Sequence, residues 1–470
     1  MAPKVVIVGA GISGLAIAES IERHSAAAGR PIRPVIFEAE PEAGGKITSH
    51  KEQGFVIDSG PHGFLDKEPK MFELIERLGL SDRVIGANKE AENRFIVRQG
   101  RLRKLPSSPP AFLAGDVLPL LGKLRVLWEP FAKGRPDAEE SVWQFAARRI
   151  GKPAADVLID AMVTGIYGGD PKKLSLPAAF PRMFELETQY GSLIKAQLAI
   201  AKQKKKALPA GASAPKGGAG GPTGTLHSFQ EGLGELTRAL ASRAEVRPKM
   251  NLAQLEREGS GFRLKGPGLD QAADRVVLAI PAFEAERLLL PHAEAPARTL
   301  GQIPYASIAV LVAGYRASAL PRPLDGFGFL IPNGEARSIL GTIWASSVFP
   351  IHVPEGAIML RTMIGGERRA ELLEKSDDEL IQLSRAELAQ WVGLDPKAEP
   401  LVEKVIRWPR GIPQYSLGHA TRVAAADALE AALPGLYLAG NALRGVAMLN
   451  CVADADRVGA RVVAETLAQG

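Results

Sequence analysis

Apolar and polar positions follow one another along this chain in patterns that predict strands and helices in turn. Residues 5–8 are four consecutive β-branched apolar residues, a run typical of a parallel strand buried on both faces. From residue 15 to 21 the apolar positions recur at helical spacing, and residues 34–37 form the next apolar run. Strand, helix and strand in this order predict an α/β unit with a parallel sheet.

The same patterns continue towards the C-terminus. Apolar runs at 307–313 and 357–364 predict strands, and residues 377–392 have the spacing of an amphipathic helix. Residues 246–281 predict two or three strands, and 435–441 a strand that ends in a glycine turn. We therefore expect four parts: a nucleotide-binding domain at 1–90, 222–294 and 411–470, a helical domain at 91–205, a flexible low-complexity loop at 206–221, and a mixed-sheet domain at 295–410.

A glycine-rich turn joins the first strand to the first helix, with the sequence Gly9-Ala10-Gly11-Ile12-Ser13-Gly14. The first glycine permits a tight turn, the second lets the backbone approach a pyrophosphate, and the third lets helix and strand pack closely. The next strand ends in Glu38-Ala39, which places a carboxylate where it can accept hydrogen bonds from the hydroxyls of a ribose. A chance glycine-rich turn is the alternative, but the ordered strand, turn, helix, strand and acid favour a dinucleotide site.

Composition narrows the class of protein. At 470 residues, with 46% hydrophobic and 23% charged residues, the chain can form two or three domains with cores of their own. A net charge of +6 without a concentrated basic module argues against nucleic-acid binding. The single Cys451 excludes an intramolecular disulfide and suits a reducing compartment, and no metal-ligand spacing occurs. The first strand begins at once and no long apolar run follows, so we expect an intracellular protein without a membrane span.

Two further segments point to a flavin. Gly44-Gly45-Lys46 and Asp58-Ser59-Gly60-Pro61-His62-Gly63 follow the acid, and this arrangement resembles the extended fingerprint of the amine-oxidase-like flavoprotein superfamily. The resemblance implies FAD as cofactor, with Lys46 at its diphosphate, although a solvated surface lysine is the alternative. A helix after the C-terminal glycine turn would direct its N-terminus at the flavin ring. The remaining residues expected at the cofactor are Gly60, Pro61, His62, Gly63, Met250 (at the adenine), Asn441, Val446, Ala447 and Met448.

Nearly the whole chain is similar to the protoporphyrinogen oxidase family, in the segments 60–66, 93–100, 105–109, 164–175, 326–332 and 408–415. By this resemblance Arg94 would pair with a propionate of the tetrapyrrole, and the carbonyl of Gly165 would face the macrocycle. Apolar side chains would sandwich its rings: Phe327, Leu330, Ile343 and Met363. A surface arginine in a hairpin, and plain core residues, are the alternatives from pattern alone. Near the last helix the family often has an Asn-Asp-Cys run, where this chain has Asn450-Cys451.

The resemblance implies the oxidation of protoporphyrinogen IX to protoporphyrin IX in haem synthesis. Six electrons leave in three two-electron steps, with flavin N5 as hydride acceptor, and three O2 become three H2O2. The sequence shows no acid–base pair, and none is required, so no catalytic side chain is expected. The alternatives are a coproporphyrinogen III oxidase with four propionates to bind, another amine-oxidase-like enzyme such as a carotenoid desaturase, and a non-catalytic flavin-bearing membrane scaffold.

Residues 102–127 place short apolar clusters between basic side chains, Arg101, Arg103, Lys104, Lys123 and Arg125. This pattern suits a monotopic membrane surface, and it equally suits a helical cap with a core of its own. We expect a cytoplasmic protein held peripherally on the inner face of the cell membrane, with a tetrapyrrole and O2 as partners. The sequence leaves monomer and homodimer both open.

Overall fold

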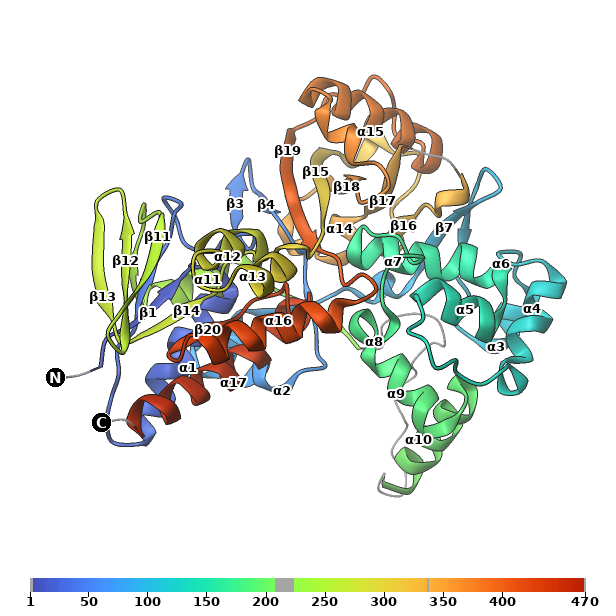
Figure 1. Cartoon of the computed structure of the whole chain (residues 1–470). Helices are drawn as coiled ribbons and strands as arrows, with labels where there is room; N and C mark the ends of the chain where they lie inside the picture. Colours follow the sequence, from blue (N-terminus) through green and yellow to red (C-terminus); the bar gives the residue numbers. More distant parts are fainter. Residues whose placement is uncertain (1–2, 208–223, 336–337, 469–470) are drawn as a thin grey trace. The chain divides into compact units, whose positions relative to one another are not determined.

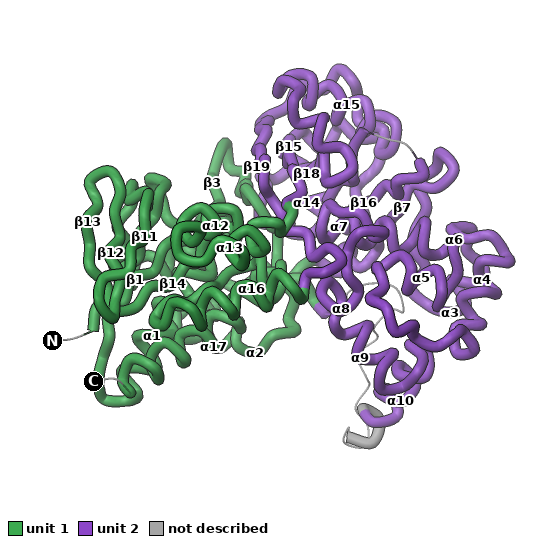
Figure 2. Tube along the Cα trace, viewed as in Figure 1, with its two compact units in different colours: residues 1–87, 225–304, 420–470 green, residues 88–224, 305–419 purple. Residues whose placement is uncertain are grey.

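A computed structural model describes residues 3–207, 224–335 and 338–468. The chain divides into two compact units, coloured separately in Figure 2. Unit 1 comprises Met1–Ala87, Thr225–Pro304 and Ala420–Gly470, and unit 2 comprises Asn88–Gly224 and Tyr305–His419. The helical and mixed-sheet segments, expected as separate domains, therefore belong to one unit. Most of the loop predicted at 206–221 lies outside the described residues.

Unit 1 contains a five-stranded parallel sheet in the order β10-β2-β1-β14-β20. Its strands are β1 (Val5–Val8), β2 (Val35–Phe37), β10 (Glu245–Arg247), β14 (Arg275–Leu278) and β20 (Leu436–Leu438). All four residues of β1 are buried, as the continuous apolar run predicts. The helices of this unit are α1 (Ile12–Ala27), α2 (Pro69–Arg77), α11 (Gly234–Ala241), α12 (Ala282–Leu289), α13 (Glu294–Gly301), α16 (His419–Ala432) and α17 (Met448–Leu467). Strands from three distant chain segments thus share one core (Figure 1).

Smaller sheets complete unit 1. They are the hairpin β3 (Ser49–Glu52) and β4 (Phe55–Asp58), the sheet β5 (Phe64–Leu65), β9 (Leu226–Phe229) and β6 (Val84–Gly86), and the sheet β11 (Gln254–Glu258), β12 (Gly261–Gly266) and β13 (Leu269–Ala273). Residues 246–281 were expected to hold two or three strands, and the structure corrects this. They contribute to five strands, because β11–β13 form an antiparallel sheet of their own while β10 and β14 join the parallel sheet.

Unit 2 contains a seven-stranded mixed sheet in the order β19-β15-β18-β17-β16-β7-β8. The strands are β7 (Arg94–Arg98), β8 (Arg101–Lys104), β15 (Tyr305–Arg316), β16 (Gly328–Leu330), β17 (Ile339–Ile343), β18 (Ala357–Gly365) and β19 (Val402–Pro413). Only the β16–β7 pair is parallel among the neighbours of this sheet. On one face, α15 (Asp377–Val392) packs through Leu380, Leu388 and Trp391 into a core with Leu311, Phe329 and Leu360.

The helices of residues 109–207 belong to unit 2: α3 (Pro109–Ala114), α4 (Leu120–Leu127), α5 (Val142–Ile150), α6 (Lys152–Ala154), α7 (Asp160–Tyr167), α8 (Leu176–Ala179), α9 (Pro181–Tyr190) and α10 (Leu193–Ala207), with α14 (Ala345–Val348) later in the chain. Val117, Leu118, Val157 and Ala161 form a second core with Ile96 of β7, against which Leu330 packs. No helix in the described part of the chain is long and apolar enough to cross a bilayer. The predicted α/β class is confirmed.

Candidate active site

The glycine-rich turn before α1 has a separate reason for each glycine. Gly9 has a φ of +101°, and a Cβ there would lie 2.7 Å from the Ala279 carbonyl oxygen. A Cβ on Gly14 would lie 1.9 Å from the carbonyl oxygen of Gly9, so strand and helix can pack this closely only through glycine. Gly11 differs, because a Cβ there would meet nothing within 4 Å. Its backbone therefore faces open space at the start of α1.

This N-terminus of α1 can receive an anion. The helix is capped by Gly11, and within the described part of the chain no side chain caps its first-turn N–H groups. These donors and the positive end of the helix dipole suit a phosphate. Ile12 and Ser13 contribute the first N–H groups of the helix, and both residues are buried.

Glu38 lies at the carboxyl end of β2 and is 8% exposed. Its carboxylate accepts the N–H of Ala10 at 2.7 Å and the N–H of Glu40 at 2.9 Å. Each oxygen keeps a further lone pair, so the carboxylate can also accept ribose hydroxyls. Met250 donates its N–H to the Glu38 carbonyl at 2.8 Å, which places the residue predicted at the adenine beside the one predicted at the ribose. Ala39 follows Glu38 and is exposed.

The Gly44-Gly45-Lys46 turn lies beside Ala10 and Gly11, in the glycine-rich turn before α1. Gly44 donates its N–H to the Ala10 carbonyl at 2.8 Å, and a Cβ on Gly45 would lie 3.3 Å from the Cα of Gly11. Burial lowers the pKa of Lys46 to about 8, so its ammonium is held partly away from water. A diphosphate at the start of α1 would supply the opposite charge that restores this pKa.

Residues 60–63 have structural reasons for their identity. A Cβ on Gly60 would lie 2.1 Å from the Lys46 carbonyl oxygen, and one on Gly63 would lie 2.7 Å from the Cγ of Leu226. His62 is buried, and its Nδ1 lies 3.0 Å from the Oδ2 of Asp58, which fixes the turn that contains Pro61. Packing inside unit 1 thus accounts for Gly63, and its predicted contact with the cofactor stays a prediction.

The C-terminal segment adds a second helix start. Gly440 has a φ of +115°, and a Cβ there would meet nothing within 4 Å. Helix α17 begins at Met448 after Ala447, and no side chain among the described residues caps it. The predicted contacts Asn441, Val446, Ala447 and Met448 therefore lie between a glycine turn in open space and an uncapped helix N-terminus, both suited to an anionic or polar ligand.

In unit 2, strand register brings the predicted substrate residues onto one face of the seven-stranded sheet. Gly328 pairs with both Arg94 and Ile343, so these side chains share a face. Leu330 pairs with Gly341, which pairs with Met363, and this second row lies two residues along on the same face. The opposite face packs on α15.

Helix α7 packs against the face of the sheet that carries Leu330. A Cβ on Gly165 would lie 2.9 Å from the Cδ1 of Leu330, so a side chain there would displace the Leu330 side chain on this face of the sheet. Leu330, Ile343 and Met363 are half-buried in a sheet whose other face is core. The structure thus gathers all six predicted substrate residues within unit 2, and their contact with a substrate stays a prediction.

Arg94 is the only charged member of the predicted set. Its guanidinium carbon lies 4.7 Å from the centroid of the Phe327 ring. Burial lowers the pKa of Arg94 below its usual value, and Arg94 forms no ion pair with a carboxylate of the described residues. The side chain remains charged, so it is a partly desolvated cation that lacks an anion.

The family model for flavin containing amine oxidoreductase matches residues 12–463 of this chain. The chain belongs to this family. FAD is its cofactor and it is an oxidoreductase, as the nucleotide fingerprint predicts, so the non-catalytic alternative is set aside. The glycine turns, the uncapped helix starts and Glu38 fit the dinucleotide.

Within this family, the chain is similar to two porphyrinogen oxidases of known sequence and to one solved structure. The chloroplastic protoporphyrinogen oxidase of Nicotiana tabacum is 32% identical, over 97% of this flavoprotein and 85% of the relative. Coproporphyrinogen III oxidase of Bacillus subtilis is 28% identical over 95% of both chains. A crystal structure from Exiguobacterium, provisionally described as a protoporphyrinogen oxidase, has a TM-score of 0.82 and 26% identity over 99% of both chains.

Sequence reasoning missed Arg361 of β18. It pairs in register with Ile343, so its Cβ lies on the same face as Arg94, and the residue is 2% exposed. A lone arginine inside the apolar run 357–364 is the signal that could have revealed it, because such a charge is rarely buried without a specific role. Among the described residues no cluster of His, Cys, Asp or Glu could hold a metal.

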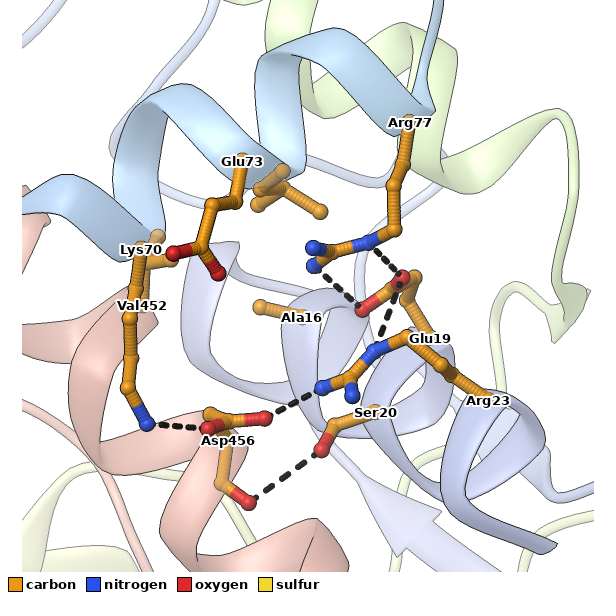
Figure 3. Close-up of a pocket in the computed structure, with 10 residues that line it drawn as sticks. Ala16, Glu19, Ser20, Arg23, Lys70, Glu73, Arg77, Val452 and Asp456 are labelled. Carbon is orange, nitrogen blue, oxygen red and sulfur yellow. Dashed lines mark hydrogen bonds and ion pairs between the residues drawn. The ribbon is translucent and has the colours of Figure 1, made fainter. Parts of the chain in front are cut away.

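An ion network on the outer side of α1 is separate from these sites (Figure 3). Asp456 of α17 pairs with Lys70 of α2 and with Arg23 of α1, and Glu19 of α1 accepts from Arg77 of α2 at 2.7 Å. The cavity they line is only about 60 Å³, and opposite charges already fill it. The network fastens the nucleotide-binding helix to its neighbours.

Proposed function

We propose that the protein oxidises protoporphyrinogen IX to protoporphyrin IX in haem synthesis, with removal of six electrons and reduction of three O2 to three H2O2. The observation that carries this proposal is Arg94, a partly desolvated cation at an apolar sheet face that has no anionic partner among the described residues. A tetrapyrrole with propionates has the complementary chemistry, since it joins carboxylates to a large apolar ring. The similarity to protoporphyrinogen oxidases supports the same substrate.

In this proposal the chain binds and orients, and bound FAD supplies the hydride acceptor. Arg94 holds a propionate through its planar fork, and Phe327 stacks on the guanidinium and keeps it in place. Leu330, Ile343 and Met363 exclude water from one side of the ring, while Gly165 presents backbone only. Proton loss from the pyrrole nitrogens needs no dedicated base, so orientation is the main contribution of the protein.

The test is a direct assay with both porphyrinogens. Purified, FAD-loaded protein is mixed with protoporphyrinogen IX or coproporphyrinogen III, and porphyrin fluorescence and H2O2 are recorded together. We expect the protoporphyrinogen reaction to have the larger kcat/KM, with three H2O2 per porphyrin. Bound flavin without oxidation of either substrate would contradict the proposal and favour another amine-oxidase-like reaction.

Arg361 favours a second candidate, coproporphyrinogen III oxidation. It lies three strands from Arg94 on the same row of the sheet, a separation of roughly 14 Å at the usual strand spacing. Cations at both ends of an apolar row suit a substrate with propionates on all four rings. A larger kcat/KM for coproporphyrinogen III would favour this second function, which the Bacillus subtilis relative also supports.

We further propose that the protein lies peripherally on the inner face of the cell membrane. Seven large apolar side chains between residues 113 and 131 are exposed: Leu113, Leu120, Leu121, Leu124, Leu127, Trp128 and Phe131. We call these seven side chains the apolar patch. So much exposed apolar surface in a short segment is typical of an interfacial site. Arg103, Lys123 and Arg125 bind Asp116 and backbone carbonyls within unit 2, so apolar burial rather than charge would dominate membrane binding.

A further inference from the structure

Gly165 can act on a substrate only through its backbone, so its position depends on whatever holds α7. The fit between α7 and the sheet is tight, because a Cβ on Gly165 would lie 2.9 Å from Leu330. Directly before α7, residues Ala155–Ile159 form a π-helical turn, an irregularity that changes the helical register. The placement of α7 against the sheet therefore needs fixed points along α7 itself.

Arg368 supplies two such points. It follows the end of β18, and its Nη1 donates to Asp160 Oδ1 at 2.5 Å while its Nη2 donates to Thr164 Oγ1 at 2.8 Å. Asp160 and Thr164 stand one turn apart on α7, and Thr164 is the immediate neighbour of Gly165. The Arg368 and Asp160 side chains are 19% and 8% exposed, so solvent weakens this ion pair only in part.

The C-terminal end of α7 is held by the same turn and by β19. Glu367 donates its N–H to the Gly168 carbonyl at 2.7 Å, and the Gln414 amide donates to the Tyr167 carbonyl at 2.8 Å. Gly366, with a φ of +79°, comes so close that a Cβ would lie 2.6 Å from the same Gly168 oxygen. These bonds fix where α7 ends, whereas Arg368 holds the side of the helix next to Gly165, where Asp160 also accepts the N–H of Asn333 at 2.8 Å.

We propose that Arg368 is a positioning residue, which sets the place of the Gly165 backbone against the apolar sheet face and so the orientation of the bound substrate. This inference rests on the proposed tetrapyrrole oxidation. Removing the guanidinium would leave the buried Asp160 carboxylate without its cation, with the Asn333 N–H still bound to it, and α7 would move to rehydrate it. Gly165 would move with the helix.

The experiment compares Arg368→Gln, Arg368→Lys and Thr164→Val with wild type, using porphyrinogen oxidation by FAD-loaded protein. Arg368→Gln should raise KM about tenfold, and kcat should fall because the ring is misoriented. Arg368→Lys keeps the charge for Asp160 but cannot span both partners, so its melting temperature should return close to wild type while KM stays raised. Thr164→Val keeps the ion pair and should raise KM by about two- to fivefold.

The matched control is Arg369→Gln, an adjacent arginine whose side chain forms no hydrogen bond or ion pair within the described residues; its KM should stay unchanged. A purely structural role would lower the melting temperature without changing KM in the molecules that remain folded. Wild-type KM in both Arg368→Lys and Thr164→Val would overturn the inference, even if Arg368→Gln fails to fold. If the wild type oxidises neither porphyrinogen, the proposed function fails and this inference falls with it.

Discussion

The guanidinium of Arg94 lies over the ring of Phe327, with 4.7 Å between the guanidinium carbon and the ring centroid. Arg94 begins β7 and Phe327 immediately precedes β16, the one parallel pair of the mixed sheet, so the contact joins segments more than 230 residues apart. A cation held on a ring face is restricted in rotation and partly desolvated. Both effects prepare Arg94 to hold a carboxylate in one orientation.

Arg94→Ala should raise KM for the porphyrinogen about tenfold, because a charge-assisted pair lost from a half-buried site corresponds to about 1.4 kcal/mol. The effect on kcat should be smaller, since a propionate is bound about equally in the ground and transition states. Arg94→Lys should recover only part of the loss, because an ammonium lacks the planar fork. Steady-state kinetics at matched flavin content measures this, and an unchanged KM would remove Arg94 from the site.

Local chemistry made much of this fold predictable. The helix predicted at 377–392 is confirmed as α15, because Ser376 and Glu379 form a capping box at its start and Gly393 ends it with a φ of +73°. The glycine turn before α1 was predictable for a similar reason, since a Cβ on Gly14 would lie 1.9 Å from the carbonyl oxygen of Gly9, five residues earlier. Such signals lie within a short window of sequence.

Long-range relationships were not predictable. Arg361 reaches the face of Arg94 only through the register of three successive strand pairs, which no local pattern encodes. The ion pair of Arg368 and Asp160 joins residues more than 200 positions apart in the sequence. The basic side chains at 101–125 predicted a charged, exposed surface. Lys123 instead turns inward and donates to the Leu113 carbonyl at 2.7 Å. A sequence pattern cannot distinguish such a buried lysine from an exposed one.

Gly11→Val should give a folded protein that has lost its flavin. A Cβ at Gly11 meets nothing within 4 Å, so the protein itself tolerates it, while the side chain enters the space that the diphosphate needs. Flavin absorbance after purification and a thermal melt of the apoprotein measure the two effects separately. Gly134→Val is the matched control, since Gly134 also has open space around it and a backbone outside the left-handed region. Retained FAD in Gly11→Val would contradict the assigned phosphate position.

FAD affinity should fall as pH rises through about 8, the pKa to which burial lowers Lys46 in the protein without cofactor. A diphosphate favours the ammonium form, so binding raises this pKa and takes up a proton above it. Between the two pKa values the affinity should drop about tenfold per pH unit. Lys46→Met should bind FAD more weakly at neutral pH and lose this slope. Titrations of each apoprotein with FAD across this pH range measure the affinities. The same pH dependence in wild type and Lys46→Met would refute the contact between Lys46 and the diphosphate.

Asp456→Asn should destabilise unit 1 by about 1–2 kcal/mol at neutral pH, between the values for exposed and buried pairs. Burial raises the pKa of Asp456, but hydrogen bonds from Lys70, His24 and Arg23 outweigh it and hold the pKa well below its usual value. The stabilisation is therefore present above about pH 4 and is lost as pH falls further. Urea unfolding at several pH values should show the difference from wild type shrinking in acid, with the exposed Asp427→Asn as a near-neutral control.

Replacing Leu120 and Leu121 together by Ser should release the protein from vesicles. These residues of the apolar patch are 68% and 80% exposed, and burying a leucine side chain in lipid contributes about 1.5–3 kcal/mol, so the pair should change the partition coefficient by at least a hundredfold. Because Arg103, Lys123 and Arg125 are engaged within unit 2, wild-type protein should be released by detergent more fully than by salt, from vesicles that contain anionic lipid. Co-sedimentation measures both effects.

Ile351→Ser removes an apolar side chain that is 59% exposed but lies outside the patch, and it should leave partition unchanged. Equal sedimentation of wild type with and without vesicles would instead make residues 109–131 a helical cap in water.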